Sequence, residues 1–224
     1  MILLYAVARA DDQRTAATAA EHGLQAHVDL GVAIFHRAVD RAPSPETGEV
    51  LEFGSVVSAL AGVGAILPLR FGSVVEDRQA LLDLTAERAA GWSALLDDLA
   101  GGSELIIHLP PPAPQAGAQG RPGEGATAAD PPTGSEGRTQ AGAGRAYLTA
   151  RAAVAHAKSE QLGQLRRLPA VRDVRSLTRN RVSVLVRDPE RACAQISQWV
   201  AAEGIGGVEV TGPWPPFSFC EAAT

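Results

Sequence analysis

The sequence predicts an α+β protein of two small domains joined by a Pro/Gly-rich disordered tether, the second domain being ferredoxin-like. Three observations predict this class. The chain has 224 residues, enough for two small domains. Short apolar runs of strand length alternate with longer runs of helical period. One internal segment lacks the residues that build a core. We therefore expect an N-terminal α+β domain at residues 1–109, a linker at 110–144 and a C-terminal domain with a Pro/aromatic tail at 145–224.

The first domain is predicted to combine short strands with two helices. The strand-prone runs are ILLYAVA from Ile2, GVAIFHRAV from Gly31, AILPLRF from Ala65 and ELIIHL from Glu104. A first helix is expected over residues 51–60, between the second and third of these runs. Since ELIIHL directly precedes the linker, it is expected to be the last strand of this domain.

A long second helix is predicted to begin near Ser73. Ser73 and Glu76 have the spacing of a capping box, in which each side chain binds the other residue's main-chain N–H. Gly101 and Gly102 are expected to end the helix. Its apolar residues recur at an approximately helical period: Leu81, Leu84, Trp92, Leu95 and Leu99.

Residues 110–144 are predicted to form the disordered tether. Proline and glycine account for 15 of these 35 residues, and the segment has no Val, Ile, Leu or aromatic residue. It cannot bury enough apolar surface to offset the conformational entropy lost on ordering. We expect it to link the two domains without a packed structure of its own.

The second domain is predicted to begin with an Ala-rich helix over residues 146–168, which Pro169 stops. Two strands are expected next, VRDVRSL from Val171 and VSVLV from Val182. In the second of these strands, alternate valines share one face, as a pleated strand requires.

A final helix and strand complete this domain. Asp188 is a suitable N-cap, and Pro189 fits the first helical position, where its missing N–H costs nothing. Gly204 is expected to end the helix, and VEVT at residues 208–211 is the predicted last strand. The order αββαβ favours a small sheet with helices on one face, as in ferredoxin-like domains. The buried face of the helix is predicted to contain Cys193, Ile196, Trp199 and Val200.

Charge is unevenly distributed along the chain, whose formal net charge is −5. Residues 1–109 carry 7 basic and 15 acidic residues, whereas residues 145–191 carry 11 basic and 4 acidic residues. A nucleic-acid-binding module that uses residues 145–191 is one alternative. A solvated face, or a face docked on the acidic first domain, is the other. Nucleic acid is the less favoured partner, because the region lacks aromatic side chains that stack on bases. The basic cluster comprises Arg166, Arg167, Arg172, Arg175, Arg179 and Arg181.

No catalytic, cofactor or metal site is predicted. The sequence contains no GxSxG nucleophile elbow and no GxxxxGK[ST] phosphate loop. GVGAIL from Gly62 lacks the third glycine of a dinucleotide site. We therefore expect a protein that is not an enzyme, takes no cofactor and has no small-molecule substrate. No HxxxH or HExxH spacing occurs among the five histidines, His22, His27, His36, His108 and His156.

Two further observations concern location. The longest uncharged run, FGSVVSALAGVGAILPL from Phe53, falls short of the roughly 20 apolar residues that cross a bilayer, so no membrane span is expected. The two cysteines, Cys193 and Cys220, form no CxxC pair. They are expected to stay reduced in the cytoplasm and to pack as small apolar residues.

The first of two candidate structural or interaction motifs carries a single charge, Arg70, among apolar residues. A buried guanidinium is costly unless it is paired, so we expect Arg70 to bind a carboxylate or main-chain carbonyls. The motif comprises Leu67, Pro68, Leu69, Arg70, Phe71 and Gly72.

The second candidate motif is the Pro/aromatic tail. Proline cannot donate to a β-ladder, so Gly212–Pro213 is expected to end the last strand. Its aromatic side chains are expected either to fold back over the tail's own sheet or to insert into a partner. Folding back is the favoured alternative, because three exposed large aromatics would promote aggregation. Trp214→Ala is accordingly predicted to cost about 3 kcal/mol or more. The tail comprises Thr211, Gly212, Pro213, Trp214, Pro215, Pro216, Phe217, Ser218 and Phe219.

These segments resemble a known family. LPLRFGSVV from Leu67, EDRQALLDL from Glu76 and TGPWPPFSF from Thr211 are similar to the gas vesicle protein family GvpF/GvpL. MILLYAVA at the start and GRAYLTAR from Gly144 also resemble that family. The resemblance therefore covers both halves of the chain and skips the linker.

The resemblance implies a gas vesicle accessory or minor structural protein, located in the gas vesicle and the cytoplasm. It implies binding to the hydrophobic shell protein and to other assembly proteins, which assists nucleation and limits shell-protein aggregation. The residues agree with such a role. Linked domains can present more than one surface, and an apolar shell protein needs a partner to cover its surface before assembly.

Overall fold

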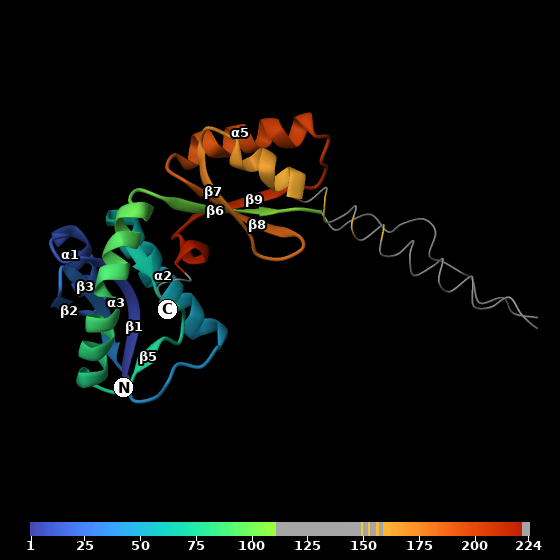
Figure 1. Cartoon of the computed structure of the whole chain (residues 1–224). Helices are drawn as coiled ribbons and strands as arrows, with labels where there is room; N and C mark the ends of the chain where they lie inside the picture. The colour runs from blue at the N-terminus through green and yellow to red at the C-terminus, as the bar shows by residue number, and fades with distance from the viewer. Residues whose placement is uncertain (111–148, 150–151, 153–155, 157–158, 221–224) are drawn as a thin grey trace, which may run out of the picture.

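The computed structural model describes residues 1–110, 149, 152, 156 and 159–220. Within them the chain has a mixed α and β fold with two antiparallel sheets (Figure 1), so the α+β class is confirmed. The elements around the first sheet are β1 (Ile2–Arg9), α1 (Gln13–Glu21), β2 (Gln25–Asp29), β3 (Val32–Ala38), α2 (Thr47–Val63), β4 (Ile66–Pro68), β5 (Val74–Val75) and α3 (Arg78–Leu99).

The second sheet is built from β6 and the chain after the linker. A helix described over residues 159–166 precedes its later strands. No helix among the described residues is both long and apolar enough to cross a bilayer. The remaining elements are β6 (Ser103–His108), β7 (Val171–Ser176), β8 (Arg181–Val186), α5 (Pro189–Ala202), β9 (Glu209–Trp214) and the 3-10 helix η1 (Phe217–Phe219).

The two sheets share one strand order. The first runs β2-β3-β1-β4, with β5 also paired to β1, and the second runs β7-β8-β6-β9. In each sheet the second strand in sequence lies at one edge and pairs with the third strand. The third strand pairs with the first, and the first pairs with the fourth. A helix follows the first strand and another follows the third in both halves. The first strand of each half is therefore interior, and the fourth is placed beside it.

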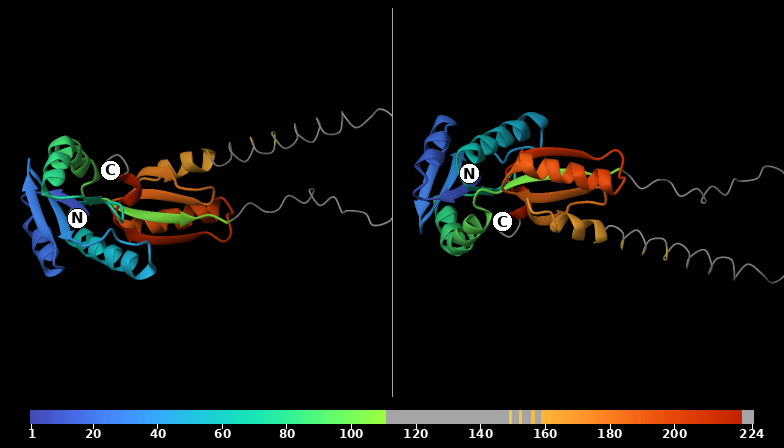
Figure 2. Two further views of the ribbon diagram at one scale, coloured as in Figure 1. Left: turned by 90° about the horizontal axis from the view of Figure 1, so that it is seen from below. Right: turned by 90° about the horizontal axis from the view of Figure 1, so that it is seen from above.

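β1 is apolar along its length because helices cover both faces of the first sheet. Leu3 and Tyr5 lie in the core cluster that contains residues of α1 and α2, including Phe53. Leu4 and Val7 lie in the opposite cluster with residues of α3. Figure 2 shows the sheet between α3 on one side and α1 and α2 on the other. A strand covered on both faces has no solvent side, so its sequence does not alternate.

The long helix α3 begins four residues after the position predicted from the capping box. Asp77 is the N-cap, and its carboxylate accepts a hydrogen bond of 2.9 Å from the main-chain N–H of Ala80. Val74 and Val75, which lie between the predicted box residues, instead pair with β1 as the short strand β5. The capping box at Ser73 and Glu76 is therefore wrong, because strand pairing holds this segment extended. The predicted apolar face is confirmed in its main residues, since Leu81, Trp92 and Leu99 are all buried.

The second half follows its predicted elements closely. Asp188 caps α5 by accepting a hydrogen bond of 3.0 Å from the N–H of Arg191, and a proline occupies the first turn. The alternate valines of β8, Val182, Val184 and Val186, are fully buried in one core cluster with residues of α5. Trp199 of α5 donates a hydrogen bond of 2.9 Å to Gln164, which joins the two helices.

The prediction that ELIIHL is the last strand of the first domain is wrong. ELIIHL forms β6, which pairs with β8 and β9 in the second sheet instead of joining the first. The chain passes from α3 into this sheet through Gly102, where an added Cβ would lie 2.9 Å from both Leu185 and the Leu99 carbonyl oxygen. The sequence of an apolar strand does not indicate which sheet the strand joins. The assignment of ELIIHL to the first domain rests only on its position before the linker. The predicted tether, apart from Pro110, lies outside the described residues.

Candidate functional site

The first motif, Leu67–Gly72, runs from the first sheet to the surface. Leu67 and Leu69 are buried in the α3-side core, and the N–H of Leu69 donates a hydrogen bond of 2.9 Å to the carbonyl of Tyr5. Pro68 is buried at the end of β4. The chain then turns, and the ring of Phe71 packs edge-on against Phe53 with centroids 5.4 Å apart.

Arg70 does not have the buried position predicted for it. Its side chain is exposed, and within the described part of the chain it makes no hydrogen bond and no ion pair. β4 ends at Pro68, and the turn that follows carries Arg70 out of the core, with its carbonyl accepting from Ser73 N–H at 3.0 Å. The apolar neighbours of Arg70 in sequence therefore pack inward while Arg70 points to solvent.

The second motif begins inside β9, which extends past the predicted stop. β9 continues through Pro213 to Trp214, which pairs with Glu104 after a register shift. β9 is an edge strand, so a proline there removes no hydrogen bond from an inner ladder. Gly212 has a φ of +128°, and an added Cβ would lie 2.7 Å from the carbonyl oxygen of Glu104. The prediction that Gly212–Pro213 ends the strand is therefore wrong.

The tail after β9 folds back, but only part of it is buried. Pro215, Pro216 and Phe219 are buried, and Phe219 is 2% exposed. Trp214 and Phe217 remain 46% and 38% exposed. Phe219 is thus buried as predicted, but it packs in the core cluster of the first sheet and not over the sheet that contains β9. For Trp214 the predicted fold-back is wrong, because this side chain lies at the end of the edge strand β9 and keeps 46% of its surface exposed.

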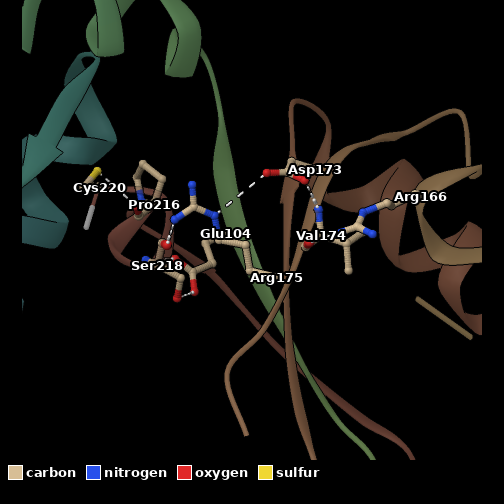
Figure 3. A network of polar contacts seen from close by, with 8 residues as sticks. All are labelled: Glu104, Arg166, Asp173, Val174, Arg175, Pro216, Ser218 and Cys220. Atoms are coloured by element: carbon tan, nitrogen blue, oxygen red, sulfur yellow. Dashed lines mark hydrogen bonds and ion pairs between the residues drawn. The ribbon is translucent and has the colours of Figure 1, made fainter. Parts of the chain in front are cut away.

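A buried carboxylate holds the tail in place. Glu104 is 2% exposed, and its two oxygens accept hydrogen bonds from Ser218, one from Oγ at 2.5 Å and one from the main-chain N–H at 2.9 Å. Arg175 donates a hydrogen bond of 2.6 Å to the Ser218 carbonyl, and its guanidinium lies 4.9 Å from the centroid of the Phe219 ring. Figure 3 shows Glu104, Arg175 and Ser218 gathered beside Pro216 and Cys220. We call Glu104, Arg175, Ser218 and Phe219 the tail latch.

The latch joins the two halves of the molecule. Phe219 and Cys220 belong to the core cluster that contains Leu69 and Leu96 of the first half. Leu185 of β8 enters the same cluster from the second sheet. The tail is therefore continuous with β9 and packs against the core of the first sheet.

Cys220 is an apolar part of this contact. Burial, with a smaller effect of Glu104, raises the pKa of its thiol to about 12. The thiol lies 3.1 Å from the carbonyl oxygen of Pro216, to which it donates. The prediction that this cysteine packs as a small apolar residue is confirmed.

Two hollows lie along α2 and are walled by the same three segments: α2, β4 with the turn after it, and the tail. The first has a volume of about 460 Å³ and is lined by Gly54 of α2, by Arg70 and Phe71, and by Phe217. The second, of about 420 Å³, is lined by Ser58 and Gly62 of α2 and by the tail from Pro213 to Pro216, and it reaches the connection from α3 to β6. We call the two hollows together the α2–tail groove.

The α2–tail groove brings the two sequence motifs together. Pro68, Arg70 and Phe71 of the first motif and Phe217 and Ser218 of the second line the same hollow. Sequence analysis missed two contributors to this arrangement. One is α2 as a wall of the groove. The other is Glu104, whose position as the one acid in an apolar strand could have marked it as a buried anchor.

A third hollow, of about 490 Å³, lies on the other side of Phe53 and Phe71. Four of its charged side chains are paired, because Arg37 binds Glu52 at 3.0 Å and Arg41 binds Glu49. The guanidinium of Arg37 also lies 5.6 Å from the centroid of the Tyr5 ring. In the described part of the chain, no three His, Cys, Asp or Glu side chains are grouped as metal ligands would be.

Several arginines of the basic cluster bind other groups of the protein. Arg166 donates to the carbonyl of Val174 at 2.8 Å, and Arg175 belongs to the tail latch. Arg172 donates to the carbonyl of Asp98 at the end of α3, whose carboxylate lies 3.8 Å away. Arg172 therefore contacts the acidic first half, as one of the two readings of the cluster predicted. With these guanidinium groups occupied, the described arginines form a weaker nucleic-acid surface than their number suggests.

Comparison with known proteins identifies the family. A model of the gas vesicle synthesis protein GvpL/GvpF family matches residues 1–221. The fold is similar to the crystal structure of the gas vesicle protein GvpF from Anabaena sp. PCC7120, with a TM-score of 0.62 and 14% identity, covering 98% of this chain and 95% of that one. It is also similar to GvpF from Microcystis aeruginosa, with a TM-score of 0.58 and 15% identity over 98% of both chains.

No curated protein sequence matches the chain. The match of the family model extends across both halves, including both motifs and the tail latch. The family resemblance predicted from LPLRFGSVV and TGPWPPFSF is thereby confirmed. The chain belongs to the gas vesicle synthesis protein GvpL/GvpF family.

Proposed function

We propose that this protein is a non-enzymatic gas vesicle assembly factor that binds the hydrophobic shell protein, assists nucleation and limits shell-protein aggregation. Membership in a gas vesicle family supports the part of this proposal that assigns the protein to gas vesicles. The α2–tail groove supports the activity. It consists of two hollows along α2 that are lined mostly by apolar and small residues, and both sequence motifs contribute to it.

The exposed aromatics of the groove fit such a role. Trp214 and Phe217 are large apolar groups that the fold leaves open to solvent although other tail residues are buried. Exposed apolar patches on a folded protein mark sites where another apolar surface binds. A shell protein that has not yet assembled presents such a surface, and covering it would keep that protein from aggregating.

The arrangement of the two halves is part of the proposal. We propose that the strand order β7-β8-β6-β9, with helices after β6 and β8, makes the second half a ferredoxin-like domain that includes β6. Residues 110–144 would then be an insertion between β6 and the helix that follows, not a tether between domains.

Co-expression of the full chain with the shell protein tests the function. The supernatant and pellet are compared after sedimentation, and the shell protein is then pulled down with this protein. We expect the shell protein to stay in the supernatant and to co-purify. A shell protein that pellets equally with and without this chain would contradict the proposal.

A truncation after Val210 is the matching variant in this experiment. It removes the tail wall of the α2–tail groove together with Ser218 and Phe219 of the latch. We expect this variant to lose co-purification of the shell protein. A truncated chain that remains folded and still retains the shell protein would show that the tail is not needed for binding.

A further inference from the structure

The α2 wall of the groove is a row of side chains spaced by four residues. Val50 and Gly54 line the first hollow, and Ser58 and Gly62 line the second. Residues four apart form one ridge on a helix surface, and small residues in such a row let another helix approach closely. A Cβ added at Gly54 or Gly62 would meet nothing within 4 Å, so the protein itself leaves this space open.

The tail wall is stiff and aromatic. Pro213, Pro215 and Pro216 restrict its backbone, and the tail latch fixes its end through Ser218. Trp214 and Phe217 keep much of their surface exposed beside the groove. Rigid aromatic side chains lose little entropy on binding and often dominate the energy of an interface. The tail wall is therefore preorganised in the free protein.

Among the described residues, Arg70 is the one charged residue that lines either hollow. Within the same residues its guanidinium has no ion pair and no hydrogen bond, whereas Arg37 and Arg41 are paired with glutamates of α2. A single open cation at the border of an apolar groove is complementary to one carboxylate on an otherwise apolar partner.

The row from Val50 to Gly62 sets the length of the occupant. Twelve residues of helix rise about 18 Å at the usual 1.5 Å per residue. A helix of roughly three turns would fill that length. A helix satisfies its own main-chain hydrogen bonds, so it can enter a groove whose walls offer few polar groups, as amphipathic helices do in other grooves.

We propose that the α2–tail groove binds one α-helix of the shell protein, about three turns long and apolar on its buried side, with one carboxylate that pairs with Arg70. This inference rests on the proposed function. A second copy of this chain is a poorer occupant. A symmetric groove-to-groove contact would bring one Arg70 toward the other, and the described residues of the groove lining supply no carboxylate to either.

The first test fills the groove. Gly54→Leu places a branched side chain in the first hollow and introduces a better helix former, so the fold is expected to hold. Gly91→Leu is the matched control, since Gly91 is an exposed helical glycine of α3 whose added Cβ also meets nothing within 4 Å. Full-length variants are tested for binding of purified shell protein in pull-downs at a series of concentrations. We expect Gly54→Leu to weaken binding at least tenfold and Gly91→Leu to leave it unchanged.

The second test reverses the charge. Arg70→Glu is expected to weaken shell-protein binding, and Arg70→Lys to preserve most of it. One acidic residue of the shell protein, replaced by arginine, should restore binding to Arg70→Glu and to no other variant. If Arg70→Glu binds as well as the wild type, or if it binds more weakly and no acidic position of the shell protein restores binding, the assignment of a carboxylate is wrong.

The outcomes separate this inference from the function on which it rests. If the wild type does not bind shell protein, the proposed function is wrong. If the wild type binds and Gly54→Leu binds equally well, the function stands and the groove is not the site. If Gly54→Leu changes only the oligomeric state of the protein alone, the groove is a contact between copies of this chain, and the inference is overturned.

Discussion

The carboxylate of Glu104 accepts two hydrogen bonds from Ser218, a residue 114 positions later in the sequence. Glu104 belongs to β6, at the start of the second sheet, and Ser218 lies in the tail that packs on the first half. One buried side chain therefore ties the Pro/aromatic tail to the place where the two halves of the protein meet. Because the tail forms a wall of the α2–tail groove, this contact also fixes the shape of the proposed site.

Glu104→Ala should lower the free energy of unfolding by about 2–3 kcal/mol, because two hydrogen bonds to a charged acceptor are lost and the Ser218 donors stay buried. Urea-induced unfolding followed by circular dichroism measures the change. Glu209→Ala is the control, since Glu209 is an exposed glutamate on the neighbouring strand β9. Equal unfolding midpoints for the two variants would contradict the latch.

Phe219→Ala and Trp214→Ala should differ strongly in stability. Phe219 is 2% exposed, and its truncation should cost about 3–5 kcal/mol. Trp214 is 46% exposed, so its truncation should cost less than about 1.5 kcal/mol, below the value predicted from sequence. Thermal unfolding of both variants measures this difference. A larger loss for Trp214→Ala than for Phe219→Ala would contradict the described burial of the tail.

Because of the Cys220 thiol, the free energy of unfolding should depend on pH in the alkaline range. The pKa of this thiol is raised from the ordinary 9.0 to about 12, so the folded protein keeps a proton that the unfolded chain releases. The free energy of unfolding should therefore fall as pH rises from about 9 toward 12. Burial also raises the pKa of Tyr5, so the comparison is with Cys220→Ala, in which the fall should be smaller. Identical pH profiles for the two proteins would contradict the buried, neutral thiol.

The same thiol reports on the tail. In the folded protein at pH 8, Cys193, which is half-buried, should react with a thiol reagent faster than Cys220, which is buried. Glu104→Ala should accelerate the labelling of Cys220 without changing that of Cys193. Mass spectrometry of the labelled peptides distinguishes the two sites. A Cys220 labelling rate that Glu104→Ala leaves unchanged would indicate that the latch does not hold the tail.

Local signals in the sequence predicted those elements whose boundaries depend on neighbouring residues. Asp188 and Pro189 placed the start of α5, and the alternation of valines placed the buried face of β8. The short helix α1 escaped prediction because its buried positions are Thr15 and Ala19, which form no apolar stripe. The edge strand β2 escaped for the same reason, since most of its residues are exposed.

The remaining differences between the predicted and the observed structure come from contacts between segments that are distant in the sequence. The partner sheet of β6 depends on β8 and β9, which lie beyond the linker. Arg70 reaches the surface because of the turn after β4, although Leu69 directly before it is buried. The two motifs could be recognised individually, but their meeting across α2 depends on the latch at Glu104. No local pattern encodes that contact.

The proposed site can be tested directly by photo-crosslinking in cells that assemble gas vesicles. A photo-reactive amino acid is placed at Ser58, which lines the α2–tail groove, and separately at Ala90, an exposed position on α3. Adducts are identified by mass spectrometry after irradiation. The account predicts a covalent adduct with a helix of the shell protein from position 58 and none from position 90. A folded protein that gives no shell-protein adduct at position 58, or equal adducts at both positions, would contradict it.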